Sequence, residues 1–369
     1  MSLGAASRLH NNALFRVDSG VEIRGFLDDS TKQVEWGEAH LLAGLHEFLS
    51  TYSKRPIKKN VLGMRLDHSF GLWFVARQLE PQIIIESGGL RGHTTWVLRQ
   101  AMPDARIISI SPKYPLSHLE DGLGAYVDSN CEYLTGEKFV DFGYVRWDRH
   151  LRQDADRSKI LVFFDDHQNH LKRMSQASRA GFKHLVFNDN CDTGHGDQYS
   201  LRQVCDQVSN GGGHTCSTNS QEAETRNLRK KMWENAVNIS DLCSQGGAWW
   251  GKQGRAYDDF GKTNAPISYE QHVKNFHLLE SILDTYWELP PLAAAYLTRQ
   301  TTFDPARTSW PLVFNLKDTS IFSKIGFDKW LFNAYAYMVY ARLKNDIPFE
   351  FQLEIEQEWV NNLGTDPKY

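Results

Sequence analysis

The stretch IIIESGGLRGHTTWVLRQ, residues 83–100, is the most informative segment of the sequence for predicting the fold. It begins with three β-branched apolar residues, a composition typical of a strand that is buried on both faces. Glu86 ends this strand, and a turn with Gly88 and Gly92 leads into a helix-like segment. Glycines allow a tight turn and a close approach, and a helix start offers free N–H groups to a ligand. The turn therefore indicates a ligand site, although packing alone also explains many such turns.

Further apolar runs have the character of short strands. They are ARIISIS (105–111), FGYVRW (142–147), ILVFF (160–164) and HLVFNDN (184–190). Helix-length segments separate the runs. The fold is therefore predicted to be α/β, with a Rossmann-like, doubly wound, mainly parallel sheet and helices on both faces. Ligands of such sheets bind at the carboxyl ends of the strands. The residues that end or follow the five predicted strands are Glu86, Ser111, Asp148, Asp165 and Asp189.

Composition shifts divide the chain into four parts. Residues 1–60 are expected to form an N-terminal helical extension and residues 61–205 the Rossmann-like core. Residues 206–265 are rich in Gly, Ser, Asn and Gln, which predicts a polar insertion or lid after the fifth strand. Residues 266–369 are expected to supply C-terminal helices and closing edge strands of the same domain.

Periodicity predicts several elements around the core strands. Helices are expected over 36–54 and over 63–81, where Pro81 ends the second one. A third helix is expected over 270–289. The late apolar runs 310–316 and 333–343 are expected to be antiparallel edge strands.

The composition is that of an ordinary globular chain. It has 369 residues, 41% hydrophobic and 23% charged, with a formal net charge of -4. This charge argues against a broad nucleic-acid-binding surface. No apolar run approaches the roughly 20 residues that span a bilayer. The first residues lack an apolar core of signal-peptide length, so a cytoplasmic location is the default expectation.

The cysteines leave two interpretations open. They are Cys131, Cys191, Cys205, Cys216 and Cys243, and the last four lie in one polar stretch. Free thiols in a reducing compartment are one interpretation. The other is two disulfides in a secretory lumen such as the Golgi, which the sequon at Asn238 also fits. The absence of a CxxC pair from the sequence argues against a structural zinc site.

The first turn, E-x-G-x-x-x-G, resembles that of the class I S-adenosylmethionine-dependent methyltransferases. The resemblance is greatest to the metal-dependent sugar and macrolide O-methyltransferases and the cephalosporin-hydroxylase-like proteins. It covers residues 63–201 and rests on IIIESGGLRGHTTW, ILVFFDDHQ and HLVFNDN. In that family the first loop holds the methionine part of the cofactor. The resemblance thus implies that Glu86, Gly88 and Gly92 bind S-adenosylmethionine, with Ser87, Arg91 and Thr94 as lesser candidates.

The second strand departs from the family pattern. There the family usually has an Asp or Glu that binds the ribose hydroxyls, whereas this chain has Ser111, then Pro112. A serine makes one hydrogen bond where a carboxylate accepts two, so weaker ribose recognition is implied. Asp148, by resemblance, lies where the family often places an acidic or polar residue near the adenine.

Acidic residues follow the fourth and fifth predicted strands. Because neighbouring parallel strands are about 5 Å apart, Asp165 and Asp189 are expected to converge on a hard cation, Mg²⁺ or Mn²⁺. The resemblance implies Asn190 as a further metal ligand and Asp166 as an alternative to Asp165. Asp165 and His167 are the predicted catalytic residues. His167, which titrates near neutrality, is the expected base for a substrate hydroxyl.

A purely structural role for these carboxylates is the alternative. Asp165 or Asp166 can instead cap the predicted helix 168–180, in which His170 is expected to be exposed.

The predicted function is metal-assisted O-methylation of a sugar-like or polyol small molecule. The expected partners are a small-molecule or carbohydrate acceptor, without nucleic acid, and the sequence leaves a homo-oligomer open. A nucleotide-sugar-dependent glycosyltransferase that uses FDD (164–166) is a second hypothesis. A non-catalytic Rossmann-like binding protein is a third, which Ser111 favours.

Overall fold

A computed structural model describes most of the predicted core. The described residues are 26–27, 33–34, 36–60, 63–122, 124–190, 198–205, 269–293, 311–313, 318–323, 325 and 338–345. The predicted insertion (206–265) lies outside these ranges, as do Cys191, Cys216 and Cys243, three of the four cysteines of the disulfide interpretation. Cys131 is a free, half-buried thiol.

The fold is built on a seven-stranded sheet with the order β5-β4-β3-β6-β7-β9-β8. The strands are β3 (Ile83–Ser87), β4 (Arg106–Ile110), β5 (Cys131–Leu134), β6 (Leu161–Phe164), β7 (His184–Phe187), β8 (Leu283–Glu288) and β9 (Val339–Leu343). The strands from β3 to β7 pair in parallel, and β9 is antiparallel to both β7 and β8. Numbered from β3, the order is 3-2-1-4-5-7-6. The predicted α/β class with a mainly parallel sheet is therefore confirmed.

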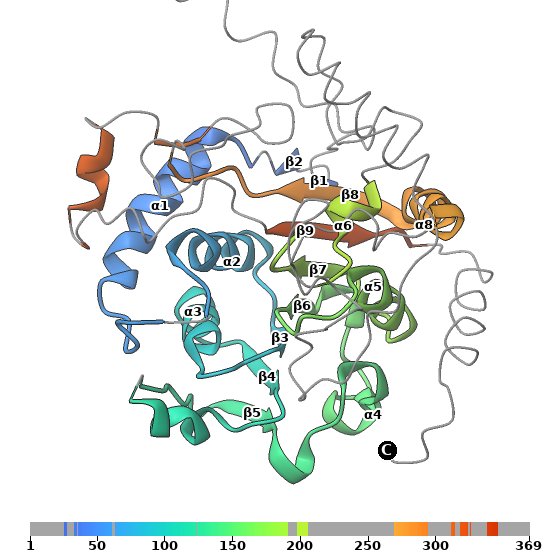
Figure 1. Ribbon diagram of the computed structural model, residues 1–369, viewed down its shortest axis with the longest axis horizontal. Helices are drawn as coiled ribbons and strands as arrows, with labels where there is room; N and C mark the ends of the chain where they lie inside the picture. Colours follow the sequence, from blue (N-terminus) through green and yellow to red (C-terminus); the bar gives the residue numbers. More distant parts are fainter. Residues whose placement is uncertain are drawn as a thin grey trace, which may run out of the picture.

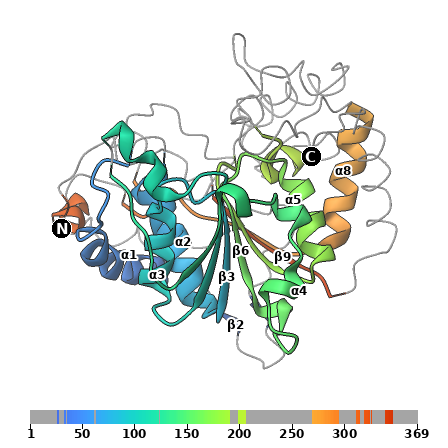
Figure 2. The ribbon, with the colours of Figure 1, turned by 90° about the horizontal axis from the view of Figure 1, so that it is seen from below.

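Helices cover both faces of this sheet (Figures 1 and 2). They are α1 (Glu38–Tyr52), α2 (Leu66–Leu79), α3 (His93–Ala101), α4 (Trp147–His150), α5 (His170–Arg179), α6 (Leu201–Cys205) and α8 (Tyr269–Ile282). The first three lie on one face, and the other four lie on the opposite face. Adjacent strand residues alternate between the two cores, so Phe163 joins the core of the first face and Phe164 that of the second. Strands β1 (Phe26–Leu27) and β2 (Gln33–Val34) form a separate hairpin-like pair.

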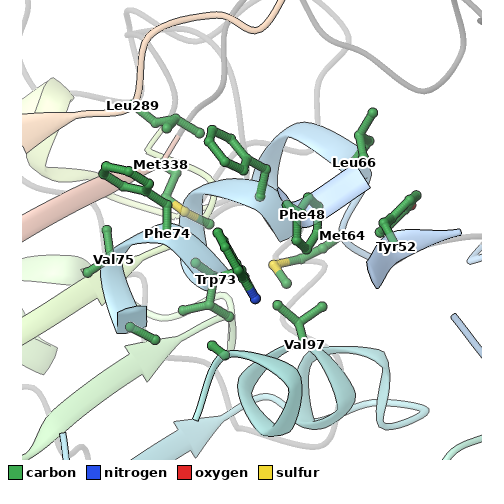
Figure 3. Packing of buried hydrophobic residues seen from close by; sticks show 14 of the residues in the cluster. Phe48, Tyr52, Met64, Leu66, Trp73, Phe74, Val75, Val97, Leu289 and Met338 are labelled. Atoms are coloured by element: carbon green, nitrogen blue, oxygen red, sulfur yellow. The ribbon is translucent and has the colours of Figure 1, made fainter. Parts of the chain in front are cut away.

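The first core is dense around α2 (Figure 3). Trp73 and Phe74 of α2 pack there with Phe48 of α1 and Val97 of α3. A side chain at Gly71 would meet the Leu289 side chain at 2.5 Å and Met338 at 2.8 Å, so these side chains would have to move. Burying each of these large apolar side chains stabilises the fold by about 1.5–3 kcal/mol.

The third predicted strand is wrong. The strand that pairs with β4 is β5, and residues 142–147 instead form the turn η3 (Phe142–Tyr144) and the start of α4. A side chain at Gly143 would clash with Gln176 of α5, and Phe142 packs edge-on against Phe164 at 4.8 Å. The aromatic residues of this run therefore serve packing beneath a helix and not strand pairing.

The C-terminal part differs from the prediction in one strand. The predicted helix 270–289 ends at Ile282, and β8 follows at once with LDTYWE. The β-branched and aromatic residues of that segment suit the edge of a sheet. The run 333–343 supplies β9, as predicted. In the run 310–316, the described residues 311–313 belong to no sheet strand, and Val313 makes a parallel bridge to Ala293.

Candidate active site at the carboxyl edge of the sheet

The first glycine turn is in backbone contact with the end of β6. Gly88 has a φ of +106°, and a side chain there would clash with the Asp165 carbonyl. The Asp165 N–H donates to the Ser87 carbonyl at 2.8 Å. Gly88 is therefore required because two loops of the carboxyl edge meet, whether or not a ligand also approaches it.

Gly92 also faces the chain itself. It is the N-cap of α3 with a φ of +84°, and a side chain there would clash with the Tyr126 carbonyl. The Tyr126 N–H donates to the Arg91 carbonyl at 2.9 Å. The sequence places Gly92 where a cofactor would approach, but this close approach belongs to the Tyr126 backbone. A large side chain at position 92 would therefore disturb folding as well as binding.

Glu86, the penultimate residue of β3, is a fully buried carboxylate. Thr95 donates to its Oε2 at 2.6 Å, while its Oε1 has no hydrogen-bond partner among the described residues. Burial raises the pKa of this carboxyl, which hydrogen bonds from Ser109 and Thr95 partly oppose. A buried acceptor without a donor costs about 1–3 kcal/mol, so this oxygen is suited to a donor from a ligand.

The two remaining cofactor candidates lie in different surroundings. Ser111 directly follows β4, is buried, and donates its N–H to the Leu134 carbonyl at 3.3 Å. Asp148 follows no strand, contrary to the prediction. It is an exposed residue of α4, and Arg157 donates to its carboxylate. Ser111 therefore lies at the carboxyl end of a strand, as predicted, and Asp148 does not.

Three predicted residues converge beyond β6 and β7. Asp165, His167 and Asp189 each offer a ligand atom, and these atoms lie within 4.8 Å of one another. The His167 Nδ1 is 4.0 Å from the Asp189 Oδ2, too far for a hydrogen bond. His167 and Asp189 adopt left-handed φ values of 55° and 52°. Such backbone conformations cluster at functional sites because they aim side chains at a cost of about 1–3 kcal/mol each.

The electrostatics of this cluster favour a bound cation or proton. Burial and the charge of Asp189 raise the pKa of Asp165 to about 8, and His167 opposes this shift. Asn188 also opposes it, because its Nδ2 donates to the Asp165 Oδ1 at 2.7 Å. Two neighbouring carboxylates repel unless a positive charge lies between them. Asn188 is not among the site residues predicted from the sequence. Its position directly after β7 and before Asp189 could have identified it.

Asp166 does not join the cluster. It is buried, and it accepts hydrogen bonds from the Ser87 hydroxyl at 2.5 Å and from the Arg173 Nε at 2.9 Å. The N-cap of α5 is Asn169, whose side chain accepts from the Lys172 N–H at 3.1 Å. The interpretation of Asp165 or Asp166 as that cap is therefore wrong.

The amide of Asn190 is engaged on the other side of β7. Its Oδ1 accepts from the Arg202 N–H at 2.9 Å. Its Nδ2 donates to the Tyr286 hydroxyl at 3.1 Å and to Glu288 at 3.3 Å. The side chain that the resemblance implied as a metal ligand is thus hydrogen-bonded to α6 and β8.

His170 is buried, contrary to the expectation that it is exposed. Its ring stacks on Phe187 at 4.6 Å, and its Nδ1 accepts from the Leu201 N–H at 3.2 Å. Burial lowers its pKa to about 3, so the ring is neutral at physiological pH. The contacts of this histidine are those of a packing role.

Comparisons with known proteins concern the fold. No family model matches the sequence, and the search of curated proteins finds no match. Among solved structures, an O-methyltransferase from Bacillus cereus in complex with SAH is 14% identical, with a TM-score of 0.27; 59% of this chain and 90% of that chain are covered. TomG, an O-methyltransferase from Streptomyces achromogenes involved in tomaymycin synthesis, was solved with SAM. It is 15% identical, with a TM-score of 0.25 and coverages of 43% and 74%.

A third similar structure is the SAH-bound methyltransferase PaMTH1 from Podospora anserina. It is 13% identical, with a TM-score of 0.25 and coverages of 52% and 74%. All three likenesses are at low identity and low TM-score, so the fold assignment rests on the strand order. Among the described residues, no helix is long and apolar enough to cross a membrane.

Proposed function

We propose that this chain is an S-adenosylmethionine-dependent methyltransferase that methylates a hydroxyl of a sugar-like or polyol small molecule with the help of Mg²⁺ or Mn²⁺. The observation that carries the proposal is the convergence of Asp165, His167 and Asp189 at the edge of the sheet that also carries the Glu86 turn. The resemblance of the three sequence motifs supports the choice of cofactor.

The cation fits the cluster by the chemistry of its donors. Asp165 and Asp189 offer carboxylate oxygens, the ligands that Mg²⁺ and Mn²⁺ prefer. Asp166 and Asn190 fit it less well, because their side chains are already engaged by Arg173 and by Arg202. When bound, the cation lowers the pKa of a neighbouring hydroxyl.

The chain's own residues then perform proton transfer and positioning. One ring nitrogen of His167 takes the hydroxyl proton, and the Asp189 carboxylate, 4.0 Å from Nδ1, stabilises the imidazolium. Asn188 orients Asp165 through the hydrogen bond to Oδ1. The cofactor, when bound, supplies the methyl group. The Glu86 Oε1 is the free acceptor for one of its donors.

Calorimetry with S-adenosylmethionine tests the proposal. Binding is expected for the wild type and for Asp148→Asn, because the Asp148 side chain is exposed on α4. Glu86→Gln is expected to bind about tenfold more weakly, since the change affects a buried acceptor. Uridine diphosphate serves as the second ligand. Binding of uridine diphosphate but not S-adenosylmethionine would favour a glycosyltransferase, and binding of neither would contradict the cofactor assignment.

A non-catalytic binding protein is the second candidate, and Ser111 favours it. The hydroxyl of this buried serine stands where a ribose-binding carboxylate is usual in the family. A wild type that binds neither S-adenosylmethionine nor uridine diphosphate would support this candidate.

A further inference from the structure

Arg173 holds two separate segments of the carboxyl edge together. It lies in α5, and its side chain is fully buried. Its Nε donates to the Asp166 Oδ2 at 2.9 Å. Its Nη1 and Nη2 donate to the two carboxylate oxygens of Asp141 at 2.9 and 2.7 Å. One guanidinium therefore joins the loop after β6 to the segment that leads into η3.

Asp166 extends this link to a third segment. The hydroxyl of Ser87, the last residue of β3, donates to the Asp166 Oδ2 at 2.5 Å. We call the linked side chains Ser87, Asp166, Arg173 and Asp141 the buried ion chain. It connects the end of β3, the loop after β6 and the segment after β5.

Asp166 lies between two residues of the candidate site. Consecutive Cα atoms are 3.8 Å apart, so anchoring Asp166 restricts both Asp165 and His167. His167 has a left-handed φ of 55°, a conformation that persists only where its surroundings hold it. The guanidinium that binds Asp166 is one group that can hold it.

Net stability alone does not explain the buried charge. Replacing a buried ion pair by packed apolar residues is often neutral or stabilising, because removing two charges from water is costly. In some proteins, buried polar or ionic groups instead give conformational specificity.

We infer that Arg173 and Asp166 are positioning residues that place Asp165 and His167 for cation binding. The inference rests on the proposed function, because it concerns the same candidate metal site. Asp141 binds the same guanidinium but lies on a segment that contributes no residue to the cluster. It therefore provides a matched control.

The test compares Asp166→Asn with Asp141→Asn in the full chain. Each variant removes one carboxylate charge from Arg173. Mn²⁺ affinity is measured by electron paramagnetic resonance titration, and the midpoint of chemical denaturation is measured alongside. Asp166→Asn should weaken Mn²⁺ binding by about 10- to 100-fold, the range for residues that orient metal ligands. Asp141→Asn should change it by less than about threefold. Equal changes in the two variants would overturn the inference.

Arg173→Lys separates positioning from direct ligation by Asp166. If Asp166 itself bound the cation, loosening its bond to the guanidinium would tighten Mn²⁺ binding. The positioning role predicts the opposite, weaker binding in Arg173→Lys. Ser87→Ala keeps every charge and removes only the hydroxyl that donates to Asp166, so it provides the test if the charge variants do not fold. It should weaken Mn²⁺ binding as well, and unchanged affinity in this variant would count against the inference.

Hydrogen exchange distinguishes failure of this inference from failure of the proposed function. The backbone amides of residues 165–168 should exchange faster in Asp166→Asn than in Asp141→Asn, with or without metal. If the wild type binds no Mn²⁺ but this difference is found, the metal site fails and the positioning role stands. If exchange is equal in the two variants, the positioning role is contradicted.

Discussion

Asp165 and Asp166 are neighbours in the chain, but their surroundings are opposite. Asp166 is buried against the Arg173 guanidinium and also accepts the Ser87 hydroxyl. Asp165 accepts from a neutral amide, that of Asn188, and faces the carboxylate of Asp189. The negative charge of Asp166 is balanced by Arg173, whereas that of Asp165 is repelled by the Asp189 carboxylate. This difference indicates that Asp166 holds the loop and that Asp165 is the carboxylate of the pair suited to a cation.

The largest expected effect on stability comes from removing the counter-charge of Asp166. Arg173→Met should lower the free energy of unfolding by about 3–5 kcal/mol, because it leaves a buried carboxylate without its counter-charge. Arg152→Met is the control, since the pair of Arg152 with Asp154 is on the surface. Its denaturation midpoint in urea should equal that of the wild type. Similar midpoints for the two variants would show that the buried ion pair is dispensable.

The next effect concerns the backbone that holds Asp165. Gly88→Ala should cost about 2–3 kcal/mol, because it combines a left-handed φ with a clash against the Asp165 carbonyl. Gly122→Ala has a similar φ, +67°, but open space around the new carbon. It should cost only about 1 kcal/mol. Thermal denaturation of both variants measures the difference, and equal losses would remove the evidence for a tight contact at Asp165.

The pH dependence of stability should have opposite signs for the two environments. The folded-state pKa of Asp165, about 8, lies above its unfolded value of about 3.9. Its contribution to stability is therefore complete below pH 4 and is lost as the pH rises through 8. Without metal, the melting temperature of the wild type should fall over this range by more than that of Asp165→Asn. Parallel curves would contradict the raised pKa.

Asp141 should affect the pH dependence of stability in the opposite direction to Asp165. Burial raises the pKa of this carboxyl, but the charge and hydrogen bonds of Arg173 outweigh burial and leave the pKa below its usual value. Its contribution is present above the unfolded pKa of about 3.9 and is lost as the pH falls through the folded-state pKa. Asp141→Asn lacks this acid-sensitive contribution, so urea denaturation followed by circular dichroism should show a smaller fall in its free energy of unfolding between pH 7 and about pH 3 than in that of Asp165→Asn. The reverse order would be inconsistent with the ion pair.

The smallest expected change in stability is at His167. His167→Asn should alter the free energy of unfolding by less than about 0.5 kcal/mol, because the residue is half-buried and Asn tolerates a left-handed φ. Methyl transfer, where an acceptor is found, should fall by about 10²–10⁴-fold with the loss of the base. His40→Asn on α1 serves as the control and should retain the wild-type rate.

Much of the sheet could be predicted from local pattern. The runs that gave β3, β4, β6 and β7 are mostly apolar, as strands buried on both faces are. β8 could not be predicted, because it continues α8 without a glycine or proline between them. The run 142–147 has aromatic and branched residues like a strand, but its fate depends on Gln176 of a later helix.

The candidate site also contains residues that the local sequence predicted and residues whose roles depend on distant partners. Strand ends predicted Asp165, His167 and Asp189, because position in the chain is enough to place them at one edge. The role of Asp166 depends on Arg173, seven residues later in a helix, and on Ser87, 79 residues earlier. The orientation of Asn190 depends on Tyr286, 96 residues later. Such long-range partners leave no local signal.

The central claim, that Asp165 and Asp189 bind a cation, is tested most directly by thermal denaturation with Mn²⁺ and with EDTA. Asp189→Asn is the informative variant, because Asn suits the φ of 52° at this position and should preserve the fold. Mn²⁺ at about 100 times its dissociation constant should stabilise the wild type by about 2.7 kcal/mol, and Asp189→Asn should lose most of this gain. Equal melting temperatures in Mn²⁺ and EDTA for both proteins would contradict the metal site.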